Sequence, residues 1–259
     1  MSLSLLAQMY ELARRSVLRT LRQPAQIFPS LLFPIFLLAV NAGGLDRATH
    51  LPGFPTHSYL TFALAITFMQ GGMFAIMNAG TDLANDVETG FLNRLALTPL
   101  RGSALLSGML AGAVVLGLIQ AATFLLVGVV TGAGFAAGAP GALVIVALSL
   151  LMALGFGAVG AFAALRTGSG EAVQGLFPLF FVLLFLSSMS LPRNLIQTDW
   201  FREIATYNPV SYLIEAIRSL LITGWDAEAL ALGFGIALAI AVAGLTAASM
   251  ALKSRLVRT

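Results

Sequence analysis

The chain has 259 residues, of which 58% are hydrophobic and only 10% are charged, and its mean hydropathy is +0.92. Soluble domains carry about 25% charged residues, so this composition excludes a soluble enzyme, a nucleic-acid-binding protein and a disordered tail. The remaining class is a polytopic membrane protein. The absence of cysteine excludes disulfides, cysteine-ligated metals and thiol nucleophiles.

The first predicted element is an amphipathic helix over residues 2–22, in which apolar and charged side chains gather on separate arcs at helical spacing. The apolar arc holds Leu3, Leu6, Tyr10, Ala13, Val17 and Leu21, and the charged arc holds Glu11, Arg15, Arg19 and Arg22. Such a helix lies in the membrane interface. The alternative is a solvated basic extension that only sets the topology.

Six apolar stretches follow, each suited to cross a bilayer as a helix. They are residues 27–43, 59–80, 104–130, 141–165, 173–191 and 229–252, and none of them contains Asp, Glu, Lys or Arg. The first stretch could instead be a cleaved signal peptide, although Pro29 and Pro34 interrupt its apolar core. Glycine and alanine in the third and fourth stretches favour close helix packing.

The distribution of positive charge predicts the orientation, because cytoplasmic loops hold the excess of Lys and Arg. With the N-terminus inside, ten basic residues fall on the inner side and four on the outer side. Both termini are therefore predicted to be cytoplasmic.

Several chemistries have no residues to support them. Ion-driven pumps need ionisable groups at membrane depth, and the predicted spans have none. A phosphate-binding loop needs lysine after glycine, but Leu252 precedes Lys253, the only lysine. His50 and His57, the only histidines, are interpreted as solvated residues of an outer loop rather than metal ligands.

The inner segment 82–101 predicts a short amphipathic helix at the membrane surface. Gly90 opens it, Phe91, Leu95 and Thr98 share one side, and Pro99 ends it. An aromatic anchor and a charge on such a helix suit the docking of a protein partner. A plain solvated turn is the alternative.

The outer segment 192–228 contains the apolar run Val210–Thr223, which is too short and too charged for an ordinary span. It is predicted to be re-entrant or interfacial. Glu215 and Arg218 are three residues apart, so they are predicted to reach each other on one helix face.

Two spans have side chains suited to line a path for an apolar or neutral molecule. Met69, Met73 and Met77 recur at steps of four in the second span, and phenylalanines do so in the fifth; methionine is adaptable at permissive surfaces. The candidate lining residues are Thr67, Gln70, Met73, Met77, Asn78, Phe177, Phe181, Phe185 and Ser188. Ordinary helix packing is the alternative for each.

Two motifs resemble the ABC-2 type permeases of ABC exporters. They are Gly90-Phe91-Leu92-Asn93-Arg94 with Thr98-Pro99 in the inner segment, and the run from Tyr207-Asn208-Pro209 to Glu215-Ala216-Ile217-Arg218 in the outer one. The first is closest to the daunorubicin/doxorubicin-resistance branch. In this family acids are commoner at the position of Asn93. The resemblance covers essentially the whole chain.

The resemblance implies an all-α fold of six transmembrane helices, with an N-terminal interfacial helix and outward re-entrant helices before the last span, as in type V exporters. It implies a coupling helix that docks on an ATPase subunit, formed by Glu88, Gly90, Phe91, Leu92, Arg94, Leu95, Thr98 and Pro99. It implies an outer gate formed by Asn208, Pro209, Tyr212, Glu215 and Arg218.

As a partner, the resemblance implies an ATPase subunit that binds ATP and Mg²⁺, neither of which this chain would bind itself. A second permease copy and membrane lipid complete the expected partners, in a bacterial-type inner membrane. The expected cargo is an amphipathic drug- or lipid-like molecule. Alternatives are export of polysaccharide or glycolipid, a gradient-driven carrier, and a membrane scaffold without an ATPase.

Overall fold

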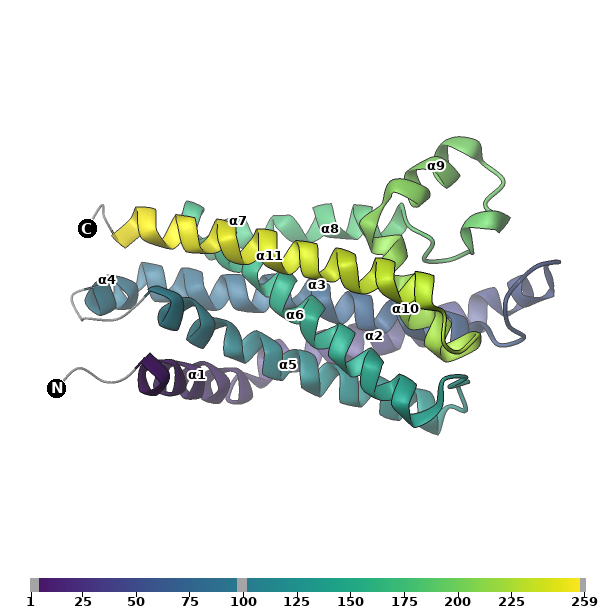
Figure 1. Cartoon of the computed structure of the whole chain (residues 1–259), viewed down its shortest axis with the longest axis horizontal. Coiled ribbons are helices and arrows are strands. Elements are labelled where there is room, and N and C mark those ends of the chain that lie inside the picture. Colours follow the sequence, from purple (N-terminus) through teal and green to yellow (C-terminus); the bar gives the residue numbers. More distant parts are fainter. Residues whose placement is uncertain (1–4, 97–101, 257–259) are drawn as a thin grey trace.

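The computed structural model describes residues 5–96 and 102–256, which form an elongated bundle of helices (Figure 1). Within these residues five helices are long and apolar enough to cross a membrane. They are α2 (Pro24–Leu45), α3 (Tyr59–Glu88), α5 (Gly102–Val130), α6 (Gly138–Thr167) and α11 (Ala227–Leu256). The predicted all-α membrane fold is confirmed at this level, and five of the six predicted spans fall inside these helices.

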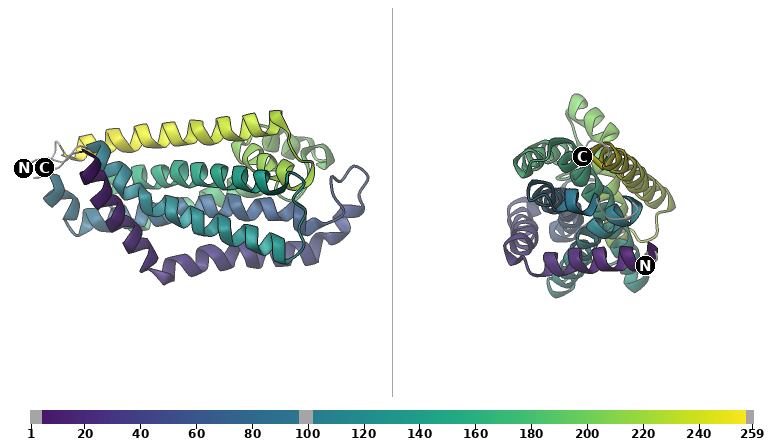
Figure 2. Two further views of the ribbon diagram at one scale, coloured as in Figure 1. Left: turned by 60° about the horizontal axis from the view of Figure 1, so that its bottom comes forward. Right: turned by 90° about the vertical axis from the view of Figure 1, so that its left-hand side faces the viewer.

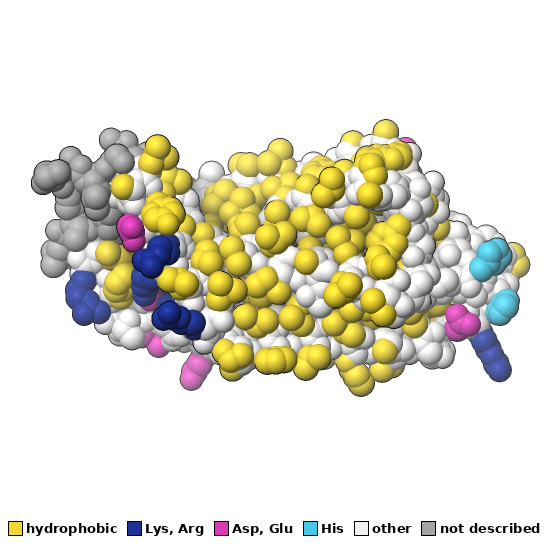
Figure 3. Space-filling view, turned by 90° about the horizontal axis from the view of Figure 1, so that it is seen from below, with side chains coloured by type: hydrophobic (Ala, Val, Ile, Leu, Met, Phe, Trp, Pro, Cys, Tyr) yellow, Lys and Arg dark blue, Asp and Glu magenta, His cyan; other side chains and the backbone are white. Residues whose placement is uncertain are grey.

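Charged side chains collect at the two ends of the bundle and leave an apolar middle on the face that Figure 3 shows. Basic and acidic side chains gather at the end where α1 lies. The histidines lie at the opposite end, beside the short helix η1 (Asp46–His50). An uncharged band of this kind matches the hydrocarbon core of a bilayer, where charged groups are costly.

Helix α3 lies at the centre of the bundle and packs against α2, α5, α6 and α10. Its crossing with α6 depends on two glycines. A Cβ added at Gly160 would lie 2.0 Å from the Ile76 carbonyl oxygen, and one added at Gly80 would lie 2.9 Å from the Gly160 carbonyl oxygen. Small residues let helix backbones approach closely in lipid, so Gly160 has the packing role predicted for the fourth span.

Helix α1 (Leu5–Leu21) lies across one end of the bundle rather than along it (Figure 2). It packs against α5, where the Ser16 hydroxyl donates to the Met109 carbonyl at 2.8 Å and accepts from the Gly112 amide at 3.1 Å. On the predicted apolar arc, Leu6 and Tyr10 are 76% and 65% exposed. The apolar arc therefore faces the surroundings, as an interfacial helix requires.

The inner segment departs from the predicted loop, because α3 continues as a helix to Glu88. Asp82 and Asp86 within its added turns form ion pairs with arginines of α1. Gly90 then turns the chain with a φ of +67°, a left-handed conformation that glycine favours. The predicted short helix follows as α4 (Phe91–Ala96). Thr98 and Pro99 lie outside the described residues.

The fifth predicted span, 173–191, is wrong as a single continuous helix. The chain forms α7 (Gly170–Gln174) and α8 (Leu176–Phe185), separated at Gly175, and has bends from Ser187 to Leu191. Together the two helices are shorter than the other spans. Side chains of a later helix take up the carbonyl groups at the end of α8, as described below.

At the end opposite α1 and α4, the outer segment forms η2 (Arg193–Leu195), α9 (Asp199–Tyr207) and α10 (Pro209–Ile222) (Figure 1). Helix α10 is buried between α3, α11 and α6. Helix α9 projects from the bundle. The apolar run Val210–Thr223 thus forms most of α10, which the other helices surround.

Candidate functional site

At the end of the bundle where α1 lies, two arginines of α1 meet two aspartates of α3. Arg15 donates two hydrogen bonds to the Asp86 carboxylate, at 2.8 and 3.0 Å. Arg19 donates to the same carboxylate at 3.0 Å, and its Nε lies 3.1 Å from Asp82 Oδ1. The Asp86 side chain is only 8% exposed, so its charge depends on these donors.

Arg15 extends this inner ion-pair cluster (Arg15, Arg19, Asp82 and Asp86) to α4. Its guanidinium lies over the Phe91 ring, 3.8 Å from the ring centroid, in a cation–π contact. One side chain therefore contacts α3 and α4 from α1. The hydrogen bonds to Asp86 raise the pKa of Arg15, against the opposing effect of burial.

The remaining predicted docking residues take different positions. Leu92 is buried in a hydrophobic cluster with Leu83, which anchors α4 to α3. Arg94 is exposed. Glu88 accepts a hydrogen bond from the Gly170 amide at 3.3 Å, which links the end of α3 to α7. Arg94 is thus available to a partner. Leu92 anchors α4 to α3, and Glu88 links α3 to α7. The docking role of α4 stays a prediction.

At the opposite end, Arg218 of α10 is buried and binds backbone carbonyls. It donates to Ser188 and Met189 just beyond α8, at 3.0 and 3.1 Å, and to Phe62 of α3 at 3.3 Å. Its guanidinium also lies 3.5 Å from the centroid of the Phe62 ring. Arginine stays protonated in proteins, so this end contains a buried cation held by carbonyls and a ring.

Three further side chains complete the outer carbonyl site (Tyr59, Asn208, Ser211 and Arg218). The Asn208 amide donates to Leu183 and Leu186 at 2.6 and 3.0 Å. Tyr59 donates to the Ser190 carbonyl at 2.9 Å, and Ser211 accepts from the Ser188 amide at 3.0 Å. The last carbonyls of a helix have no partners within that helix. Helix α8 can therefore end inside the bundle because α10 and α3 supply the partners.

Asn208 also begins α10, because its side-chain oxygen accepts a hydrogen bond from the Val210 amide at 2.9 Å and Pro209 follows as the first helical residue. Asparagine before proline is a favourable helix start. The same amide group thus caps α10 and binds the end of α8. The Asn208-Pro209 pair, singled out in the sequence, joins two helices.

The predicted pair of Glu215 with Arg218 is wrong. Glu215 instead forms an ion pair with Arg193 of η2, whose guanidinium also lies 4.5 Å from the Tyr212 ring centroid. Arg218 points away, toward α3 and α8. Burial lowers the pKa of Arg193, but the Glu215 carboxylate and Tyr212 together outweigh it, so the pKa is raised overall.

The candidate path residues divide into three groups. By helical spacing, Thr67, Gln70, Met77 and Asn78 share one face of α3 with Phe74. Phe74 contacts Phe177 at a centroid distance of 5.5 Å, and Phe181 and Phe185 continue the row of rings.

Phe33 of α2 joins this aromatic row through Phe74 and Phe181, at 6.2 and 5.8 Å. Met73 is instead buried in the main core, and Ser188 belongs to the outer carbonyl site. The aromatic row (Phe33, Phe74, Phe177, Phe181 and Phe185) therefore joins α2, α3 and α8.

Sequence reasoning missed Tyr59, Ser211, Arg193 and the aspartate partners of α1. Asp82 and Asp86 stand four residues apart, as do Arg15 and Arg19, and this matched spacing was the available signal. Tyr59 and Ser211 had no such signal, because their partners are backbone groups of residues 188–190.

Among the described residues no three histidine, cysteine, aspartate or glutamate side chains come together to hold a metal ion. His50 is exposed at the end of η1, and His57 is exposed in the turn that follows.

The architecture of long apolar helices around a charge-free middle defines the class: a multi-pass membrane protein. Residues 7–222 match the family model described as ABC-2 type transporter. The chain therefore belongs to the ABC-2 type transporter family.

The chain is similar to several transport permeases. The daunorubicin resistance ABC transporter permease protein DrrB1 of Streptomyces coeruleorubidus is 29% identical over 76% of this chain and 69% of its own length. The putative transport permease ycf38 of Pyropia yezoensis is 30% identical over 84% and 75%. The probable doxorubicin resistance permease DrrC of Mycobacterium tuberculosis is 29% identical over 55% and 51%.

Proposed function

We propose that this chain is the permease subunit of an ATP-driven exporter whose ATPase is a separate polypeptide. The observation that carries the proposal is the connection of α4 to the bundle through Arg15 and Asp86. A force applied to α4 by a partner would reach α3, the central helix, through Arg15 and the buried Leu92. ATP and Mg²⁺ would bind only in the partner.

The topology in this proposal has six crossings. Helices α7 and α8, with residues 186–191, form the fifth crossing, because irregular backbone at membrane depth is tolerated where protein groups bind it. The outer carbonyl site supplies those groups. The ends of α1 and α11 lie on the side of α4, which is the cytoplasmic side by the distribution of basic residues. The membrane would be a bacterial-type inner membrane.

The path in this proposal runs beside the aromatic row, at an interface between two copies of the chain. Helix α2 presents exposed apolar side chains there, including Phe28 and Phe36 at 62% and 63% exposure. Rings and neutral amides suit an amphipathic drug- or lipid-like molecule, and daunorubicin, named in one relative, is the first probe. Helices α9 and α10 act as the outward re-entrant gate, and alternating access opens the two ends in turn.

The test is to place a negative charge on α4 and to measure assembly with the ATPase encoded beside the chain. Arg94→Glu reverses the exposed charge of α4, and Arg166→Glu is the matched control because Arg166 is exposed at the same end, on α6. We expect Arg94→Glu to reduce co-purification of the ATPase and its drug-stimulated ATP hydrolysis at least fivefold, while Arg166→Glu retains both. Equal behaviour of the two variants would refute docking through α4.

A further inference from the structure

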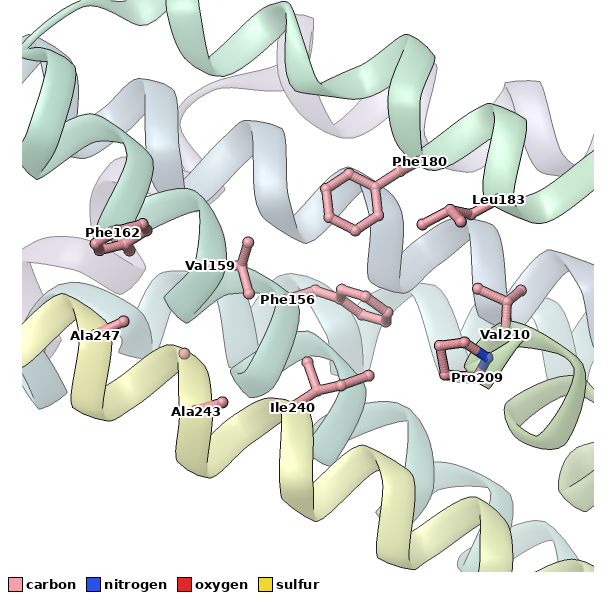
Figure 4. A pocket seen from close by; sticks show the side chains of 11 residues that line it. Phe156, Val159, Phe162, Phe180, Leu183, Pro209, Val210, Ile240, Ala243 and Ala247 are labelled. Atoms are coloured by element: carbon pink, nitrogen blue, oxygen red, sulfur yellow. The ribbon is translucent and has the colours of Figure 1, made fainter. Parts of the chain in front are cut away.

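A cavity of about 360 Å³ lies beside α8 (Figure 4). Residues of four helices line it. Phe156 of α6 and Phe180 of α8 form one wall, Ala243 and Ala247 of α11 form the other, and Pro209 of α10 closes one end. The cavity opens to the surroundings of the bundle, because Phe162 and Ala243 in its lining are exposed, so apolar groups from outside the chain can fill it.

The cavity exists because α11 approaches α6 closely while α8 stays apart. A Cβ added at Gly244 would lie 3.0 Å from the Gly155 carbonyl oxygen, so α6 and α11 are nearly in backbone contact. Helix α8 is held at its outer end by Asn208. The small side chains of Ala243 and Ala247 do not fill the remaining gap.

The chemistry of the lining restricts the occupant to hydrocarbon. Every side chain that lines the cavity is apolar. A buried water needs two to four polar partners, and a polar head group needs more. The cavity therefore suits an apolar occupant such as a hydrocarbon chain.

The surroundings of the cavity indicate where such a chain comes from. Two lining residues are themselves exposed: Phe162, at 36%, and Ala243. Both belong to helices long and apolar enough to cross a membrane. The cavity is thus continuous with the surface that faces lipid. Val242, on the opposite face of α11, is 54% exposed.

We propose that an acyl chain of a membrane lipid occupies this cavity and acts as a wedge between α8 and α11. The chain would contact Pro209 and Val210, directly beside Asn208, and so hold the start of α10 against α8. This inference does not depend on the transport proposal.

Fluorescence quenching by brominated lipid tests the proposal on the full chain in vesicles of brominated phosphatidylcholine. Trp200 and Trp225, the only tryptophans, are first replaced by phenylalanine. Phe180→Trp then reports on the cavity, and Val242→Trp is the reference on the exposed surface. Leu183→Trp, a second lining position, serves if Phe180→Trp does not fold.

We expect the cavity tryptophan to be quenched at least half as strongly as the Val242→Trp reference. Adding Ala243→Phe, which fills the cavity, should reduce this quenching at least twofold, whereas Val242→Phe, one residue away on the exposed surface, should leave it unchanged. Weaker quenching in the cavity, or quenching that Ala243→Phe does not reduce, would overturn the proposal. A second copy covering the opening would exclude lipid and give the weaker quenching, so that case also overturns it.

Discussion

The inner and outer ends of the molecule both depend on arginine, but they hold it with different partners. At the inner end Arg15 and Arg19 pair with carboxylates, and Arg15 itself is 39% exposed. At the outer end Arg218 is buried, donates its hydrogen bonds to backbone carbonyls and lies against the Phe62 ring. Arg15 is partly exposed and can exchange its contacts with water at modest cost, whereas the buried Arg218 cannot leave its carbonyl acceptors freely.

This difference suits the two ends to different tasks. The inner ion-pair cluster can shift its partners as α4 moves, because water and lipid head groups replace lost contacts. The outer carbonyl site fixes the end of α8 until α10 moves as a whole. The inner end would therefore transmit motion, and the outer end would hold a defined closed state.

The largest effect is expected at Arg218. Arg218→Met keeps an apolar side chain of similar length but leaves the Ser188, Met189 and Phe62 carbonyls without this donor. The free energy of unfolding should fall by about 3 kcal/mol, since each buried polar group left unpaired costs about 1–3 kcal/mol. Thermal unfolding in detergent measures this, with Arg202→Ala on the exposed α9 as the control. A loss as small as that of the control would contradict the account of the outer end.

A smaller effect is expected at Asp86. Asp86→Asn removes the charge that both arginines of α1 share, and the free energy of unfolding should fall by about 1.5 kcal/mol, within the range for hydrogen bonds to charged groups and reduced by the exposure of Arg15. The same thermal assay measures it. Because the cluster joins α4 to α3, ATP hydrolysis by the assembled complex should fall more than stability does. Unchanged ATP hydrolysis would show that the inner ion-pair cluster takes no part in coupling the ATPase to the helix bundle.

The smallest effect is expected for Arg193 and Glu215, which are about a quarter exposed. A double-mutant cycle with Arg193→Ala and Glu215→Ala should give a coupling free energy of about 0.5–1 kcal/mol. A parallel cycle between Glu215 and Arg218 should give less, because these side chains do not pair. A larger coupling free energy between Glu215 and Arg218 than between Glu215 and Arg193 would contradict this and favour the pair that the sequence suggested.

Much of the fold was predictable because a span in lipid must be a helix with its own backbone hydrogen bonds, and hydropathy alone locates it. The break after Phe185 was not predictable from its own residues. Its cause lies in Asn208 and Arg218, more than twenty residues later, whose side chains bind the carbonyls there. Local spacing likewise favoured Arg218 as the partner of Glu215, but α10 turns Arg218 toward α3.

The two arcs of α1 show a related limit. Helical spacing grouped Arg15 and Arg19 correctly, yet it could not say whether that group faces water or protein. The answer depends on α3, which continues as a helix far enough to present Asp82 and Asp86 to them. Phe91 and Leu92 were predicted to lie on a short helix, which forms as α4, while their contacts with α1 and α3 required the tertiary structure.

The central claim is that this chain is a passive gate moved by a separate ATPase, and uptake of the drug probe into inside-out vesicles tests it most directly. Vesicles containing the chain and its ATPase should take up the probe only when ATP is present, and vesicles containing the chain alone should not. Uptake by the chain alone, without ATP, at a rate comparable to that of the complex would contradict the claim.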